Sequence, residues 1–194
     1  MTNKEKAGRI INRYKDEYKA LKKDIEKYKD GLNNMNVFCD RMENTISSKK
    51  THRKQNLFWM GAGLLVLIPN IAIVNAVGIV CGGLLLGVHA GLAIYNTVKI
   101  SKAEKFLPTI YASKKDIEQY IEFLESRQLY VEKTIDKLTN VINDKDTIST
   151  KEVDELKAVL YAMEDARPFD EEISRQNPSH QLMQSITDEM MSNK

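Results

Sequence analysis

The residue types that could carry chemistry are few in this chain and stand far apart. The three histidines are His52, His89 and His180, and the two cysteines are Cys39 and Cys81. Neither cysteine has a second ligand at the short spacing that zinc or redox sites use. The many carboxylates fall between the apolar positions of helical repeats, where solvent-exposed charges belong. We therefore expect no enzymatic activity, no metal and no cofactor.

Unlike the other two histidines, His89 lies inside a segment of 44 residues (55–98) that contains no Asp, Glu, Lys or Arg. An ionisable group within a membrane segment lines water or a helix contact, and a neutral histidine bonded to a carbonyl is the alternative. Glycines recur around it at intervals of four, which lets membrane helices approach closely. We predict that this face packs helices together or lines a pore. Its residues are Gly78, Gly82, Gly83, Gly87, His89 and Gly91.

The length of the apolar segment predicts a helical hairpin. One bilayer crossing needs about 20 apolar residues, so the segment is long enough for two. We place the crossings at about 57–74 and 76–98, joined by a tight turn at Pro69–Asn70 or at Asn75. The turn carries no charge, so the hairpin can insert from one side of a bilayer. Because the first arm is short, a re-entrant hairpin remains an alternative.

Basic residues flank the apolar segment at both of its ends. Such clusters mark the cytoplasmic side of a membrane, so we expect an integral membrane protein with both termini in the cytoplasm. A nucleic-acid patch is the alternative for the first cluster, but its position beside the segment favours a membrane edge, and we expect no nucleic-acid partner. Trp59 fits an interfacial aromatic belt. The membrane-edge residues are Lys49, Lys50, Arg53, Lys54, Trp59, Lys99, Lys102 and Lys105.

Two regular repeats of apolar side chains lie on either side of the segment. Steps of three and four residues alternate through both, which is typical of coiled-coil helices. The repeats have equal length and run from the segment in opposite chain directions, which predicts an antiparallel coiled-coil stalk. The first consists of Ile11, Tyr14, Tyr18, Leu21, Ile25, Tyr28, Leu32, Met35, Cys39, Met42 and Ile46. The second consists of Leu107, Ile110, Lys114, Ile117, Ile121, Leu124, Gln128, Val131, Ile135, Leu138 and Ile142. Pro108 would bend or restart the second helix.

The two flanks also differ in charge. Residues 1–56 carry 15 basic and 8 acidic side chains, a net charge of +7, whereas residues 99–194 carry 14 and 19, a net charge of −5. This asymmetry favours association of the flanks and offers the basic flank to anionic lipid headgroups.

The C-terminal region predicts two short helices. Ser149 and Glu152 form a capping box for a third helix, which we expect to end at Arg167–Pro168 and to pack on the stalk. Asn177–Pro178 could begin a last amphipathic helix that docks on the bundle, binds a partner or stays disordered. We thus divide the chain into a basic heptad helix (1–54), a hydrophobic hairpin (55–98), a second heptad helix (99–143), a short amphipathic helix (149–167) and an acidic tail (168–194).

The predicted fold is all-α: a two-helix transmembrane hairpin continued by an antiparallel coiled-coil stalk with a third packed helix. This layout, over residues 1–166, resembles two families. One is the bacterial two-transmembrane (SLATT-like) effectors, a resemblance that implies permeabilisation of a membrane on activation. The other is the chlamydial inclusion-membrane proteins with a bilobed hairpin, which implies tethering of membranes and recruitment of a protein partner.

Three hypotheses follow for the function. The first is a homo-oligomeric two-pass protein that assembles through its glycine-faced hairpin and stalk and perturbs the bilayer as a pore-like effector. The second is a non-conducting adaptor or tether that recruits a protein partner through its helical bundle and acidic tail. The third is a soluble helical bundle that conceals an insertable hairpin. Against the third, the apolar segment is hydrophobic around its whole circumference, which is typical of a membrane span.

Overall fold

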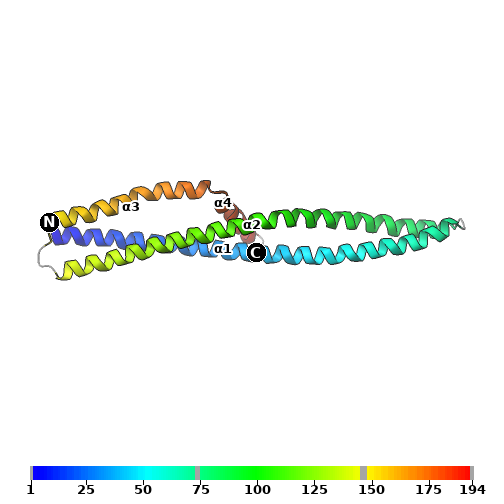
Figure 1. The fold of residues 1–194 in the computed structure, drawn as a ribbon, viewed down its shortest axis with the longest axis horizontal. Helices are drawn as coiled ribbons and strands as arrows, with labels where there is room; N and C mark the ends of the chain where they lie inside the picture. The colour runs from blue at the N-terminus through cyan, green and yellow to red at the C-terminus, as the bar shows by residue number, and fades with distance from the viewer. Residues whose placement is uncertain (1, 73–74, 145–147, 193–194) are drawn as a thin grey trace. The chain divides into compact units, whose positions relative to one another are not determined.

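The protein is all-α, as the sequence predicts. A computed structural model describes residues 2–72, 75–144 and 148–192, except for the side chains of 144, 163–171 and 173–174. It contains two long helices, α1 (Asn3–Ala72) and α2 (Ala76–Asp144), followed by α3 (Thr150–Gln176) and α4 (Pro178–Ser192) (Figure 1). The long helices have 70 and 69 residues and run antiparallel, which confirms the predicted pairing of two long helices.

The chain divides into two compact units, and α1 and α2 contribute to both. We call residues 37–111 the hairpin unit, and residues 1–36 together with 112–194 the bundle unit.

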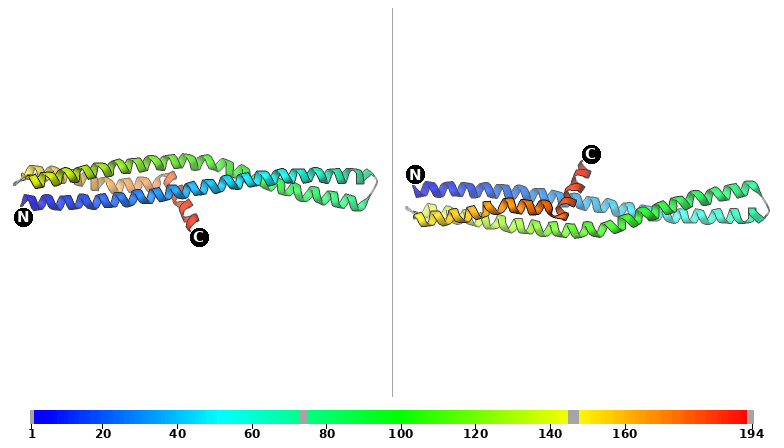
Figure 2. Two further views of the ribbon diagram at one scale, coloured as in Figure 1. Left: turned by 90° about the horizontal axis from the view of Figure 1, so that it is seen from below. Right: turned by 90° about the horizontal axis from the view of Figure 1, so that it is seen from above.

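The bundle unit packs α1, α2 and α3 side by side around an apolar core (Figures 1 and 2). Every residue of the first heptad repeat from Ile11 to Met35, and of the second from Lys114 to Ile142, is buried or half-buried. Because α3 covers one side of this pair, its own apolar stripe joins the same core. The most completely buried large side chains of this unit are Tyr14, Met35, Ile117, Val131, Val153 and Leu160.

Local hydrogen bonds explain where these helices begin. The backbone N–H of Glu152 donates to Ser149 Oγ at 3.2 Å, and the Glu152 carboxylate accepts from the Ser149 N–H at 3.0 Å. This reciprocal pair is the predicted capping box. Thr2 and Glu5 form an equivalent pair at the start of α1. Asn177 caps α4, where its side-chain oxygen accepts from the Ser179 N–H at 2.8 Å.

The third helix extends further than the sequence suggests. We expect it to end at Arg167–Pro168, but α3 continues to Gln176. A proline removes one hydrogen bond from a helix and need not end it. The effective stop is Asn177–Pro178, where proline occupies the first position of α4 and its missing N–H costs nothing. The tail from residue 168 is therefore helical over most of its described part.

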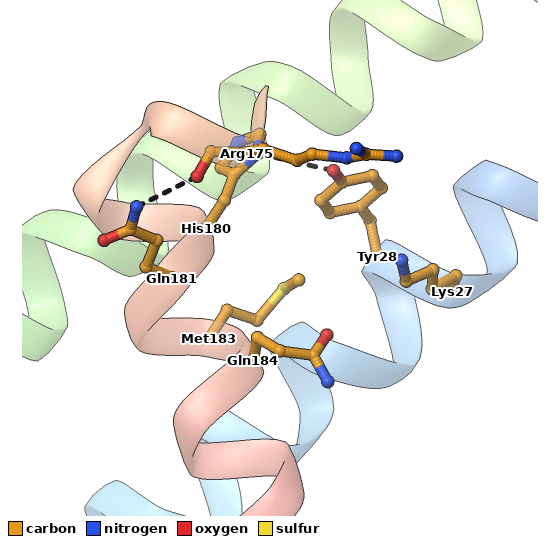
Figure 3. Close-up of a pocket in the computed structure, with 7 residues that line it drawn as sticks. All are labelled: Lys27, Tyr28, Arg175, His180, Gln181, Met183 and Gln184. Atoms are coloured by element: carbon orange, nitrogen blue, oxygen red, sulfur yellow. Dashed lines mark hydrogen bonds between the residues drawn. The ribbon is translucent and has the colours of Figure 1, made fainter. Parts of the chain in front are cut away.

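The last helix docks on α1 and α2 within the bundle unit (Figure 3). Met183 lies against Gly31, where an added Cβ would come within 2.5 Å of the Met183 sulfur. Ser179 Oγ donates a hydrogen bond to Asp116 at 2.7 Å, and Ile186 is buried. Of the three alternatives for this segment, the structure has it docked within the chain.

The turn of the hairpin lies after Pro69–Asn70. These two residues belong to the last turn of α1, so the first of the two predicted turn positions is wrong. Asn75 lies in the connection and caps α2, since its side-chain Oδ1 accepts a hydrogen bond from the Gly78 N–H at 3.4 Å. Residues 73 and 74 lie outside the described residues. Likewise α2 runs through Pro108 as one helix, so the chain does not restart there.

Candidate functional site: the apolar hairpin

Large apolar side chains cover the outside of the hairpin unit between Leu57 and Val98. Leu65 is 77% exposed, Val77 73% and Phe58 70%. The same holds along both arms, which lie side by side in every view (Figure 2). Others in this group are Leu57, Trp59, Leu64, Val66, Ile68, Ile71, Val80, Leu84, Val88, Leu92, Ile94, Tyr95 and Val98.

By length and composition, both long helices could cross a membrane. Only 6% of the most apolar stretch of α1 and 11% of that of α2 is buried within the protein. A helix in the core of a soluble protein reaches the same hydropathy because it is buried, so the low burial distinguishes these two stretches from core helices.

Polar side chains lie on the inside of the hairpin instead. The contact between α1 and α2 continues the three–four spacing of the heptad repeats through the apolar segment. Its α1 members are Asn56, Met60, Gly63, Leu67 and Asn70, and its α2 members include Gly78, Gly82, Leu85, His89, Ala93 and Asn96. All are buried or half-buried. We call this row the inner seam. Counting the heptad onward from Ile46 places Asn56 on it, a signal that sequence analysis could have used.

His89 contacts α1 through two side chains. Its Nδ1 lies 3.0 Å from Asn56 Oδ1, and its ring stacks on Trp59 with 6.2 Å between the ring centroids. His89 therefore lies in a helix contact within the chain, with a side-chain amide as its partner.

The predicted glycine face is divided between two sides of α2. Gly82 is buried, and an added Cβ would lie 2.8 Å from the backbone of Leu67. Gly78 faces the side chain of Asn70, and Gly63 of α1 packs near Leu85. Gly83, Gly87 and Gly91 point outward, with nothing within 4 Å of an added Cβ. The first group lets the arms approach closely, and the second forms a stripe that we call the outer glycine stripe.

The predicted membrane-edge residues come together at one end of the apolar segment. Lys50 forms an ion pair with Glu104 at 2.7 Å. Lys49 and Lys99 both lie over the ring of Tyr95, at 5.2 and 5.7 Å. Tyr95, which the sequence analysis did not single out, thus brings Lys49 and Lys99 together at this end.

The remaining edge residues have different surroundings. Lys54, Lys102 and Lys105 are exposed. Arg53 is half-buried and its Nε is buried without a hydrogen bond. Trp59 packs edge to face on Phe58, with 5.6 Å between the ring centroids.

Beyond the apolar segment, Tyr111 donates a hydrogen bond to Glu43, and this bond raises the pKa of Tyr111 to about 12. The two residues join α1 and α2 within the hairpin unit. Among the residues that the structure describes, no three His, Cys, Asp or Glu side chains gather as metal ligands would.

Comparison of the chain with models of known protein families, with curated proteins and with solved structures finds no match. A functional proposal for this protein must therefore rest on its own geometry and chemistry.

Proposed function

We propose that this protein is a two-pass integral membrane protein with both termini in the cytoplasm, which assembles in the bilayer and presents its helical bundle to a protein partner. The observation that carries this proposal is the reversed polarity of the apolar segment. Asn56, Asn70, His89 and Asn96 lie on the inner seam, while most of the described large apolar side chains of the segment are exposed on the outside.

In water this arrangement would be costly. Exposing one large apolar side chain instead of burying it costs about 1.5–3 kcal/mol, and more than a dozen are exposed along the two arms. In a bilayer the same apolar side chains would contact the hydrocarbon chains of the lipid, and this cost would not arise. The arms are also regular helices, which is the form that satisfies backbone polar groups in lipid.

The charges support the orientation. The basic residues at positions 49–54 and 99–105 meet at one end of the apolar segment, through the contacts of Lys50 with Glu104 and of Lys49 with Tyr95. Positive residues accumulate on the cytoplasmic side of membranes. The opposite end, at Asn75, carries no charged side chain.

Self-association is supported by the outer glycine stripe. Gly83, Gly87 and Gly91 are not needed for the contact between the two arms, because Gly63, Gly78 and Gly82 supply it. Outward-facing small residues at intervals of four let a second membrane helix approach closely. We therefore assign the stripe to contact between copies of the hairpin.

We favour an adaptor over a water-filled pore because large apolar side chains cover the outer surface of the hairpin. A pore needs polar groups toward its lumen. The polar side chains Asn56 and His89 bond to one another on the inner seam, and the exposed Thr97 hydroxyl donates to the Ala93 carbonyl at 2.8 Å.

The bundle unit offers a surface for a partner. A groove of about 670 Å³ lies between α2 and α3 and is lined in part by Tyr130, Leu156 and Val159. Phe123, Tyr130 and Tyr161 are about half exposed. Exposed aromatic side chains are enriched at protein interfaces.

Two measurements test this proposal. Gly87→Leu should shift the purified protein in detergent from oligomer toward monomer, whereas Gly61→Leu, at an outward glycine of α1 outside the stripe, should leave the oligomer intact. Reconstituted oligomer should leave dye-loaded liposomes sealed. Leakage that depends on Gly87 would overturn the adaptor in favour of the pore-like effector. An unchanged oligomer in Gly87→Leu would overturn the role of the stripe.

A further inference from the structure

One end of the hairpin unit carries a concentration of positive charge. We call residues 49–54 and 99–105 the basic collar. It contains seven Lys and Arg side chains and one acidic residue, Glu104, which pairs with Lys50 at 2.7 Å. The structure describes every residue of the collar. A net charge of +6 therefore adjoins the apolar surface of the two arms.

Two lysines of the collar meet over one tyrosine ring. Lys49 of α1 lies 5.2 Å and Lys99 of α2 lies 5.7 Å from the centroid of the Tyr95 ring. Both distances are typical of cation–π contacts. Among the described residues neither lysine forms an ion pair, and the nearest acidic residue before the collar, Glu43, accepts a hydrogen bond from Tyr111. One ring therefore holds two ammonium groups close together.

This arrangement has the donors that a phosphate group requires. A lysine ammonium carries three N–H donors and no acceptor, and the Tyr95 hydroxyl adds a further donor. Tyr95 is 53% exposed, so a ligand can reach the ring from outside. Phosphate oxygens accept charge-assisted hydrogen bonds, which are stronger than those between neutral groups. Two helices thus supply cations for one anionic group.

The face of α2 that carries Tyr95 is apolar toward the tip of the hairpin. Leu92, Val88 and Leu84 precede Tyr95 by three, seven and eleven residues, and these spacings place them on one face of the helix. Each of the three is 45–63% exposed. We call these three residues the apolar face of α2. It runs beside the outer glycine stripe, which lies one residue earlier at each turn. A ligand with acyl chains can lay them along this face while its charged group stays at the collar.

We propose that Lys49, Tyr95 and Lys99 bind the phosphate of an anionic phospholipid in the cytoplasmic leaflet, whose acyl chains lie along the apolar face of α2. A soluble anion would use the cations and leave this face uncovered, whereas an anionic phospholipid matches both. The proposal rests on the proposed membrane insertion of the hairpin. Because the site takes residues from α1 and from α2, it exists only when the two arms are paired, and the lipid stabilises the folded state.

The experiment uses the full chain in micelles of a neutral detergent and follows thermal unfolding by circular dichroism. Dioctanoyl phosphatidic acid is titrated, with dioctanoyl phosphatidylcholine and inorganic phosphate as controls. The ionic strength is about 0.15 M, where the Debye length of about 8 Å screens distant charges. A saturable rise in Tm is expected with phosphatidic acid alone. Lys49→Gln combined with Lys99→Gln should weaken the apparent affinity about tenfold or more, since each basic residue near anionic lipid contributes roughly a fivefold change.

Two further variants separate a defined site from the general charge of the collar. Lys54→Gln combined with Lys105→Gln removes the same charge at exposed positions outside the Tyr95 contact, and should change the affinity by less than about threefold because salt screens them. Tyr95→Leu removes no charge, but it should weaken the affinity because the two ammonium groups lose the ring that holds them together.

Three outcomes would overturn the proposal. They are an equal rise in Tm with phosphatidic acid and phosphatidylcholine, binding of inorganic phosphate as tight as that of phosphatidic acid, and an equal loss of affinity in the two double variants. None of them bears on membrane insertion, because extraction of membranes with alkaline carbonate tests insertion separately. The lipid site can therefore fail while the proposed function stands.

Discussion

The two units use the same helix-pairing geometry with opposite distributions of polarity. In the bundle unit, Ile117 and Leu160 are fully buried and most of the described charged residues are exposed, while the buried Glu17 is paired with Arg127. In the hairpin unit, Asn56 and His89 lie in the helix contact and Leu65 and Leu84 are exposed. The three–four spacing of the contact is common to both.

This comparison separates two kinds of information in the sequence. The spacing of the contact residues determines that α1 and α2 pair, because residues three and four apart share one face of a helix. The residue types outside the contact determine the solvent in which the pair is stable. Under the proposed function, a hairpin suited to lipid and a bundle suited to water therefore use the same pair of helices.

The largest expected effect comes from truncating the bundle core. Ile117→Ala should lower the free energy of unfolding by about 2–5 kcal/mol, because it leaves a cavity where no side chain is exposed. Leu84→Ala, at a position 63% exposed in the hairpin unit, should leave no cavity and cost far less in detergent. Unfolding followed by circular dichroism measures both. Equal costs would mean that Leu84 is buried in a contact within the protein.

The next largest effect is expected when a charge is placed on the outer surface, because the hairpin unit and the bundle unit should respond differently. Leu84→Arg should reduce the fraction of protein recovered in membranes, since an arginine at the centre of a membrane helix costs about 2.5–3.5 kcal/mol. Phe123→Arg places the same charge at a position 51% exposed in the bundle unit, and should stay within about 0.5 kcal/mol of the wild type. If both variants fractionate like the wild type, the outer hairpin surface does not face lipid.

The hydrogen bond between Asn56 and His89 on the inner seam should contribute a smaller free energy of stabilisation. A double-mutant cycle with Asn56→Ala and His89→Ala should give a coupling of about 0.6 kcal/mol, and at most about 1.7, as hydrogen bonds between membrane helices do. The exposed Lys50–Glu104 pair is the control, with about 0–1 kcal/mol and a coupling that falls with added salt. A salt-dependent coupling of Asn56 with His89 would contradict their placement on the seam.

A separate prediction concerns the pH dependence of the bundle unit. Burial raises the pKa of Tyr14 from 10.0 to about 12. Between these values the unfolded chain loses the tyrosine proton while the folded chain keeps it, so stability falls as the pH rises from about 10. Tyr14→Phe should remove this part of the fall. Spectrophotometric titration of wild type against variant measures the phenol directly, and a pKa of Tyr14 near 10 would contradict its burial.

Local patterns in the sequence predict much of this structure. The heptad residues from Ile11 to Met35 identify the buried face of α1, and Ser149 with Glu152 marks the start of α3. Both depend on neighbours within one or two turns of the same helix. The apolar segment is also evident, because its hydropathy needs no partner to be recognised.

Features that depend on contacts between helices could not be predicted in the same way. The sequence shows glycines at Gly82 and Gly83 but not which of them meets α1, since one residue along a helix turns the side chain by about 100°. Nor does it place His180 beside Tyr28, because their approach depends on how α4 returns to the bundle. A single proline, Pro168, was an insufficient stop signal because neighbouring turns can hold a helix across one missing hydrogen bond.

The central claim is that the apolar outer surface of the hairpin faces lipid. Its most direct test is the fractionation of the wild-type protein after an alkaline carbonate wash. If the hairpin faces lipid, the full-length protein remains in the membrane pellet after the wash and moves to the supernatant only when detergent is added. Recovery of the protein in the carbonate supernatant would contradict the account and would favour a soluble bundle that conceals its hairpin.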